Sequence, residues 1–99
     1  MPVARHFIMH AAAGQGPALE AALRDLADTL RRIPGCEAVQ LLREQGQPLR
    51  FVFIETWASV AAHQQASQHL SAEALAPMMA ALDGMPEGNE AYFDCLKAV

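Results

Sequence analysis

The chain has 99 residues and a mass of 10.7 kDa, which is the size of one small domain. Seven lysines and arginines against 11 aspartates and glutamates give a formal net charge of −4. This argues against nucleic-acid binding, because phosphate-binding surfaces need clustered positive charge. The sequence also lacks an apolar run of the roughly 20 residues that cross a bilayer and the layout of a secretory signal, so we expect a cytoplasmic protein that does not bind membranes.

The first two predicted elements are a strand and a long amphipathic helix. Residues 5–12 alternate between two faces, as a strand does. A glycine-rich turn follows and contains Pro17, which suits the first position of a helix. Apolar residues then recur every three or four positions from Leu19 to Ile33, and this period predicts a helix that Pro34-Gly35 ends.

Residues 36–43 and 49–57 are predicted to form an antiparallel hairpin, joined by a turn at residues 44–48. The second of these strands is the strongest in the sequence. One of its faces carries Phe51, Phe53, Glu55 and Trp57, and the other carries Arg50, Val52, Ile54 and Thr56. Large apolar side chains therefore occur on both faces of this strand.

The C-terminal half is predicted to contain two helical pieces and a last strand. Ser59 and Ser71 are good N-caps for the helical pieces. Pro77 should kink or break the second piece, since a proline inside a helix loses a hydrogen bond and clashes with the preceding turn. Residues 90–96 are predicted to be the final strand. The order β-α-β-β-α-β is typical of the α+β ferredoxin-like fold, an antiparallel four-stranded sheet with helices on one face.

The apolar side chains on both faces of the sheet also predict the oligomeric state. Val52 and Ile54 lie opposite the aromatic face of their strand, and Ile8 lies opposite Phe7 and Met9. Helices can cover only one of these faces, and an open apolar face promotes aggregation. We therefore expect a homodimer packed sheet against sheet, with a monomer that tolerates an apolar face as the alternative.

The run Phe51–Ser59, followed by His63 and Ser67-Gln68-His69-Leu70, resembles the antibiotic biosynthesis monooxygenase family. In that family a strand ends in Glu-x-Trp, Ser or Asp starts the next helix, and a helix carries two histidines around Ser-x-His. Further matching segments are Gly16-Pro17, Pro34-Gly35-Cys36 and Leu75-Ala76-Pro77. The resemblance implies one domain over residues 1–99, a dimeric α+β barrel, and a pocket in each subunit between helices and sheet.

The candidate catalytic residues are His63, Glu55 and His69. A histidine beside an aromatic pocket can take a proton from a phenol near neutral pH. The six-residue gap turns the two histidines apart on a helix, so both line one site only if the helix breaks between them. Glu55, placed among aromatic residues, needs an ion-pair partner such as Arg50 or Arg24, or else has a raised pKa and acts as a base.

The candidate substrate-binding residues are Phe51, Phe53, Trp57 and Met78. The three aromatic side chains share one strand face and can form a pocket wall. The Trp57 indole N–H is expected to be free to bond a substrate oxygen, and the flexible Met78 thioether suits a pocket lid. Packing in the core is the alternative for each of these side chains.

The family resemblance implies a cofactor-independent monooxygenase that acts on a small electron-rich aromatic, such as a hydroquinone or polyphenol, with O₂. A deprotonated substrate of this type can itself pass an electron to O₂, so no cofactor is expected. No metal is expected either, because the sequence lacks the spaced ligands of a metal site. One alternative is a non-catalytic dimer that binds a small molecule. The other is a haem-binding or haem-degrading monooxygenase, although its first-strand asparagine is replaced in this sequence by Met9 or His10.

Overall fold

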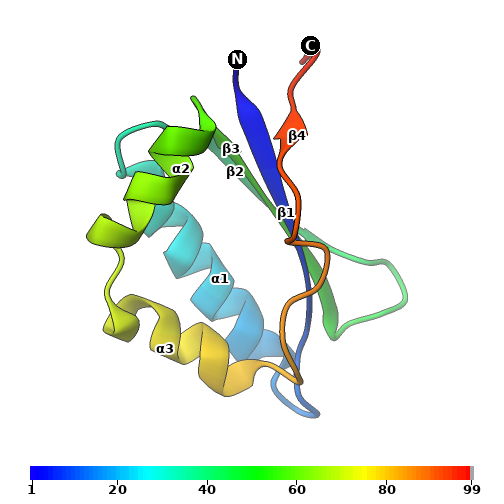
Figure 1. Ribbon diagram of the computed structural model, residues 1–99. Helices are drawn as coiled ribbons and strands as arrows, with labels where there is room; N and C mark the ends of the chain where they lie inside the picture. The colour runs from blue at the N-terminus through cyan, green and yellow to red at the C-terminus, as the bar shows by residue number, and fades with distance from the viewer. Residues whose placement is uncertain (99) are drawn as a thin grey trace.

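The computed structural model describes residues 1–98 and contains a four-stranded antiparallel sheet with its helices gathered on one face (Figure 1). The strands are β1 (Val3–His10), β2 (Cys36–Arg43), β3 (Arg50–Trp57) and β4 (Phe93–Asp94). The helices are α1 (Gly16–Arg31), α2 (Val60–Ala66) and α3 (Ala72–Ala81), with a short 3₁₀-helix, Ser67–His69, between the last two. The strand order is β2-β3-β1-β4, so the predicted ferredoxin-like fold is confirmed.

The central strands β1 and β3 decide which side chains face the helices. They pair along their whole length, from Val3 opposite Trp57 to His10 opposite Arg50. Successive side chains on a strand point to opposite faces. The alternation predicted for β3 is confirmed, since every second residue from Phe51 to Trp57 is buried beneath the helices.

Helix α1 covers the sheet through its apolar stripe. Its buried residues include Leu19, Leu23, Leu26 and Leu30, spaced by three and four positions. Full burial of each such side chain contributes roughly 1.5–3 kcal/mol to stability. The helix ends at Arg31, slightly before the predicted end, and Gly35 then turns the chain with a φ of +89°.

Helices α2 and α3 begin at the predicted caps. The Ser59 hydroxyl accepts a hydrogen bond from the Ala62 backbone N–H, and Ser71 does the same for Ala74. Of the two predicted outcomes for Pro77, a kink or a break, the break is wrong, because α3 continues through Pro77 to Ala81. Pro77 lies on the exposed side of α3, where water can bond the carbonyl that proline leaves unpaired.

The final strand is shorter than predicted. Only Phe93 and Asp94 pair with β1, instead of residues 90–96. Upstream, Glu87 forms an isolated bridge with Ile8, and between these two points the chain leaves the ladder. Gly88, with a φ of +75°, starts this excursion. Figure 1 shows the segment running from the end of α3 alongside β1.

The face of the sheet turned away from the helices keeps the apolar residues that the sequence placed there. Ile8, Val52 and Ile54 are only partly buried on this face. Leu42 on β2 is 48% exposed and Phe93 on β4 is 51% exposed. We call this surface the open sheet face.

The positions of the two cysteines and the character of the helices complete the description of the fold. Cys36 in β2 and Cys95, directly after β4, both carry free thiols and lie at opposite edges of the sheet. Among the helices of residues 1–98, none combines the length and the apolar character needed to cross a membrane.

Candidate functional site

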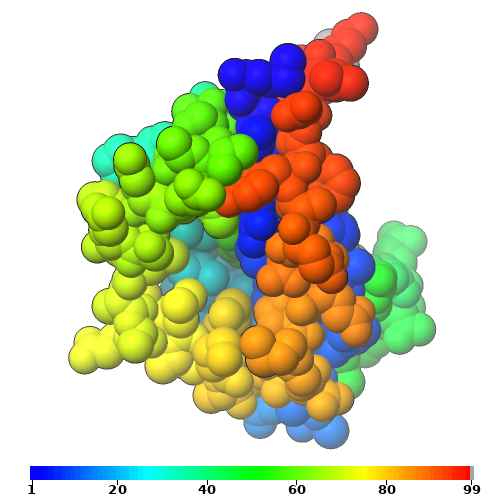
Figure 2. Space-filling model, viewed as in Figure 1, coloured from blue at the N-terminus to red at the C-terminus, as the bar shows by residue number. Residues whose placement is uncertain are grey.

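A cavity of about 270 Å³ lies between the sheet and the helices, and we call it the Trp57 cavity. Phe7 of β1 and Trp57 of β3 supply its aromatic wall, while Leu26 and Leu30 of α1 and Leu75 of α3 supply aliphatic lining. Figure 2 shows a hollow in this region, bordered by α2, α3 and the C-terminal segment, with α1 at its floor. The family resemblance implied a pocket between the helices and the sheet, and the Trp57 cavity lies in that position.

Glu55 and Trp57 form a hydrogen-bonded pair in the cavity wall. They lie two positions apart on β3, hence on one face of the strand, and both line the cavity. The Trp57 indole Nε1–H donates to Glu55 Oε1 at 2.8 Å. The sequence analysis predicted that this indole N–H is free to bond a substrate. That prediction is wrong, because Glu55 accepts its hydrogen bond. The sequence already indicates that these two side chains are neighbours, because residues two positions apart on a strand point to the same face.

Glu55 is a buried residue, only 7% exposed. Burial raises its pKa, because water no longer stabilises the charged form. The hydrogen bond from Trp57 and the positive charge of Arg5 oppose that effect by favouring the carboxylate. Arg5 is the β1 residue directly opposite Glu55 in the sheet.

The arginine partners proposed for Glu55 from the sequence are wrong. Arg50 pairs with Glu44 in the β2–β3 turn region, and Arg24 pairs with Glu20 on α1 at 3.0 Å. Arg50 points to the opposite face of β3 from Glu55, since the two residues are five positions apart. The sequence alone does not give the β1–β3 register, which is what places Arg5 opposite Glu55.

His63 is the second ionisable residue in the lining of the cavity. It lies in α2, and its ring packs edge-on against Trp57 at a centroid distance of 5.6 Å. Its Nδ1 is 2.7 Å from the Tyr92 hydroxyl. Burial, and secondarily the charge of Arg5, lower the pKa of His63, so the imidazole is neutral near pH 7. A neutral imidazole carries one N–H donor and one lone-pair acceptor.

Tyr92 and Arg5 were missed by the sequence analysis. Tyr92 precedes β4, and Phe93 after it belongs to the open sheet face, so alternation directs Tyr92 toward the helices. The Arg5 guanidinium carbon lies 4.9 Å from the centroid of the Tyr92 ring and 5.5 Å from that of Phe7. Its Nε is buried without a hydrogen-bond partner among residues 1–98.

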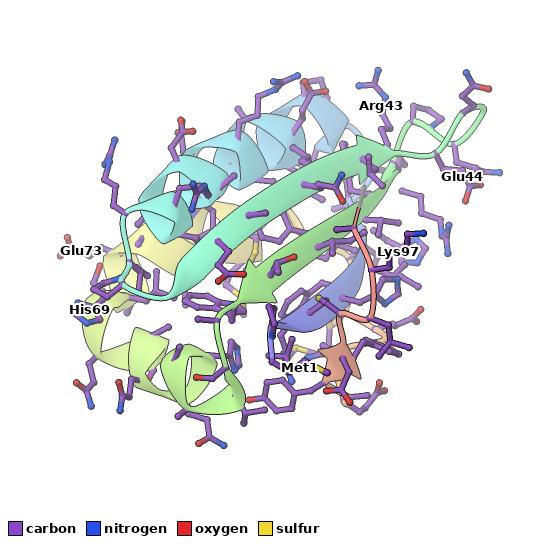
Figure 3. The ribbon with its side chains drawn as sticks, turned by 90° about the horizontal axis from the view of Figure 1, so that it is seen from above. Met1, Arg43, Glu44, His69, Glu73 and Lys97 are labelled. Atoms are coloured by element: carbon purple, nitrogen blue, oxygen red, sulfur yellow. The ribbon has the colours of Figure 1, made fainter. Side chains whose placement is uncertain are left out.

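Four of the predicted site residues do not line the Trp57 cavity. His69 is exposed on the 3₁₀-helix, and Figure 3 shows it beside Glu73 at the edge of the molecule. Phe51 and Phe53, each 1% exposed, belong to the core. Met78 packs against that core and is absent from the cavity lining. The chain does break between His63 and His69, but the break turns His69 outward.

A second and larger hollow, of about 870 Å³, lies between α1 and the edge strand β2, and we call it the α1–β2 groove. Its walls are charged, and four of the five charged residues that line it form ion pairs: Glu20, Arg24, Arg43 and Glu44. Glu20 bonds Arg24 at 3.0 Å and Arg43 at 2.7 Å, and Glu44 pairs with Arg50. Figure 3 shows Arg43 and Glu44 at the end of the hairpin. Within residues 1–98, no three histidine, cysteine, aspartate or glutamate side chains gather as a metal site would require.

The sequence profile of the antibiotic biosynthesis monooxygenase family matches residues 2–78. The chain belongs to this family. Both β3 and the helix that carries His63 fall inside the matched range, whereas Tyr92 lies beyond it. A comparison with curated proteins finds no match to this family member.

Solved structures show the same fold at low sequence identity. A protein of unknown function from Nitrosomonas europaea, NE2512, is 24% identical with a TM-score of 0.80, covering 99% of this chain and 92% of its own. Rv0793 from Mycobacterium tuberculosis is 20% identical with a TM-score of 0.78, covering 99% and 98%. SnoaB from Streptomyces nogalater, described as a cofactor-independent oxygenase, is 19% identical with a TM-score of 0.78, covering 99% and 96%. These likenesses establish the fold shared by this family member and its relatives.

Proposed function

We propose that this protein is a cofactor-independent monooxygenase of a small electron-rich aromatic, of the hydroquinone or polyphenol type. The observation that carries the proposal is the Trp57 cavity, in which two ionisable groups, Glu55 and His63, lie within an apolar and aromatic lining. An engineered protein cavity of about 150 Å³ holds one benzene ring. A cavity of about 270 Å³ therefore suits a substrate of one or two rings. The description of SnoaB as a cofactor-independent oxygenase supports the same reaction class.

The reaction needs no external reductant, because the substrate supplies every electron. A hydroquinone loses a proton to the protein, and the resulting anion passes one electron to O₂. The semiquinone and superoxide then combine to form a carbon–oxygen bond, and loss of water from the hydroperoxide leaves a hydroxylated quinone. Hydroquinone plus O₂ thus gives hydroxyquinone plus water, and both atoms and electrons balance.

The cavity supplies what this sequence of steps requires. Glu55 and His63 are the two candidate proton acceptors, and the proton must leave before electron transfer to O₂ is favourable. Phe7 and Trp57 provide flat apolar surfaces against which an aromatic ring can stack. A largely apolar lining also limits the water that would divert a reactive intermediate.

Oxygen consumption with a panel of hydroquinones, in buffer containing a metal chelator, tests the proposal. We expect one O₂ consumed per substrate and one atom of ¹⁸O₂ in the quinone product. The Glu55→Gln/His63→Ala double variant should lose turnover, by about 100-fold or more if a general base is removed. His69→Ala is the matched control, since this histidine is exposed and away from the cavity. Equal turnover by the wild type and the double variant would contradict the proposal.

We also propose that two copies pack through the open sheet face. Leu42 and Phe93 leave about half of their surface exposed there, beside the partly exposed Val52 and Ile54. Burial of such an apolar area against a second copy would be favourable. Light scattering at micromolar concentration should give twice the mass of 10.7 kDa for the wild type. Val52→Asp should give the monomer mass, and a monomeric wild type would contradict this proposal.

A further inference from the structure

The C-terminal segment places one side chain at the border of the Trp57 cavity. The segment is fixed to β1 upstream, where Ile8 and Glu87 exchange backbone hydrogen bonds of 2.7 and 2.8 Å. It is fixed again downstream, where Phe93 pairs with Ala4. Tyr92, just before this second attachment, therefore has a defined position, and it packs against the hydrophobic core. Figure 1 shows the segment close to β1 over this stretch.

Tyr92 contacts both a positive charge and the His63 imidazole. The Arg5 guanidinium carbon is 4.9 Å from the centre of the Tyr92 ring. The Tyr92 hydroxyl is 2.7 Å from His63 Nδ1, and the two rings meet edge to face at 5.3 Å. Among residues 1–98, Arg5 Nε is a buried donor without a hydrogen-bond partner, so the guanidinium beside the phenol keeps unused hydrogen-bonding capacity.

This arrangement decides which group donates in the Tyr92–His63 hydrogen bond. If Nδ1 carried the imidazole hydrogen, the positive end of its N–H dipole would point toward Tyr92, whose ring contacts the Arg5 guanidinium. If Tyr92 donates, the phenol gains electron density beside this cation. The Arg5 charge therefore favours donation by Tyr92. The same repulsion of positive charge contributes to the lowered pKa of His63.

We propose that Tyr92 is a positioning residue that donates to His63 Nδ1 and so fixes the Nε2–H tautomer of this histidine. Nε2 has no partner among residues 1–98, and His63 lines the cavity, so this N–H is available to a ligand oxygen. An N–H aimed at the ring oxygen stabilises the anion that forms when the substrate is deprotonated.

The remaining role, that of proton acceptor, falls to Glu55. Its Oε1 already accepts from Trp57, whereas Oε2 has no hydrogen-bond partner within residues 1–98, and the residue lines the cavity. The proposed function left Glu55 and His63 as alternatives for this role, and the division of labour between them rests on that function. Glu55 takes the proton, and His63 donates to the oxygen that has lost it.

The tautomer can be measured without any turnover. Long-range ¹H–¹⁵N correlation spectra of the imidazole distinguish a protonated from an unprotonated ring nitrogen. In the wild type near pH 7 we expect the hydrogen on Nε2 and a lone pair on Nδ1. In Tyr92→Phe, which keeps the ring but removes the hydroxyl, the Nδ1 signal should shift toward that of a nitrogen without a hydrogen-bond donor. A wild-type hydrogen on Nδ1 would overturn the inference.

Kinetics supply a second and independent readout. His63→Gln retains an N–H donor but offers no base, so it should keep about tenfold more activity than His63→Ala. Glu55→Gln should lose the pH dependence that an acceptor imposes on kcat. Tyr92→Phe should lower kcat by about tenfold, the value of one hydrogen bond, with KM nearly unchanged. Equal activity of His63→Gln and His63→Ala would contradict a donor role.

Failure of this inference and failure of the proposed function give different results. If the spectra show the Nε2–H tautomer but no aromatic is oxidised, the tautomer assignment stands and the monooxygenase proposal fails. If aromatic substrates are oxidised while Nδ1 carries the hydrogen, the monooxygenase proposal stands and Tyr92 is not the donor that fixes the tautomer.

Discussion

Two hollows of this molecule, the α1–β2 groove and the Trp57 cavity, differ in size and in how many of their polar groups have partners. The α1–β2 groove, at about 870 Å³, is roughly three times larger than the Trp57 cavity, at about 270 Å³. Most of the charged residues that line the groove form ion pairs, as Glu20 does with both Arg24 and Arg43. In the smaller cavity, Glu55 and His63 instead keep an oxygen and a nitrogen without a partner among residues 1–98. Unused bonding capacity in an apolar setting, and not volume, marks the candidate site.

The difference has an energetic basis. Exposed ion pairs stabilise a protein by about 0–1 kcal/mol, so the pairs lining the groove can be lost at little cost. Glu55 is a buried ionisable residue whose single hydrogen bond comes from buried Trp57, and loss of a partner from a buried polar group is costly. Substitutions in the two hollows should therefore have unequal effects on stability.

The largest effect is expected for Trp57→Ala. Trp57 is 0% exposed, so truncation removes buried packing and also leaves Glu55 Oε1 without its donor. The free energy of unfolding should fall by about 3–5 kcal/mol, measured by urea denaturation. Trp57→Phe is the control, since it keeps an aromatic ring in the core while it removes the indole N–H and part of the ring system. A loss below about 1 kcal/mol for the alanine variant would show that the cavity wall can collapse.

An intermediate effect is expected for Glu55→Gln, and its sign depends on pH. The folded-state pKa of Glu55 is raised, so the native protein holds a proton that the unfolded chain has lost above about pH 4.5. The free energy of unfolding of the wild type should therefore decline, relative to Glu55→Gln, as pH rises from that value through the folded pKa. Each unit of pKa elevation corresponds to about 1.4 kcal/mol. Parallel stability curves for the two proteins would contradict a raised pKa.

Titration of His63 also changes the free energy of unfolding with pH, but in the opposite direction to Glu55. Its folded-state pKa is lowered, so stability is lost as pH falls below about 6.5, where the unfolded chain takes up the proton more readily. Both the wild type and Glu55→Gln contain His63. The His63 contribution therefore cancels when the free energy of unfolding of one protein is subtracted from that of the other, provided that the two residues titrate independently. Differential denaturation at several pH values thus isolates Glu55.

The smallest effect is expected in the groove. Glu20→Gln removes both of its ion pairs, yet the free energy of unfolding should change by less than about 1 kcal/mol, because the arginine partners are more than half exposed. Turnover of any substrate of the Trp57 cavity should be unchanged. A loss of turnover in Glu20→Gln would transfer the candidate site to the groove and reverse the comparison.

The parts of the fold that depend on local pattern were predictable from the sequence. The alternation of β3, the apolar period of α1 and the caps Ser59 and Ser71 all follow from residues close together in the chain. The error at Pro77 had a different origin, because tertiary packing of α3 against α1 outweighs the local cost of a proline whose neighbours reach water.

The candidate site was only partly predictable, because it depends on contacts between distant segments. Glu55, Trp57 and His63 lie near one another in the sequence and were found together. Arg5 enters through the pairing of β1 with β3, and Tyr92 enters through a strand of only two residues. Neither contact leaves a periodic signal, so the electrostatic environment of His63 was absent from the sequence prediction.

The C-terminal segment is fastened to β1 at Glu87 and again at Phe93, and it is free of the ladder between them. Substitutions in this segment between Glu87 and Phe93 need not disturb the hydrogen bonds of the central strands. It lies beyond residue 78, where the family profile ends, and yet it delivers Tyr92 to the border of the cavity. Substitutions in this peripheral segment can therefore change the surroundings of His63 while the pairing of β1 with β3 stays the same.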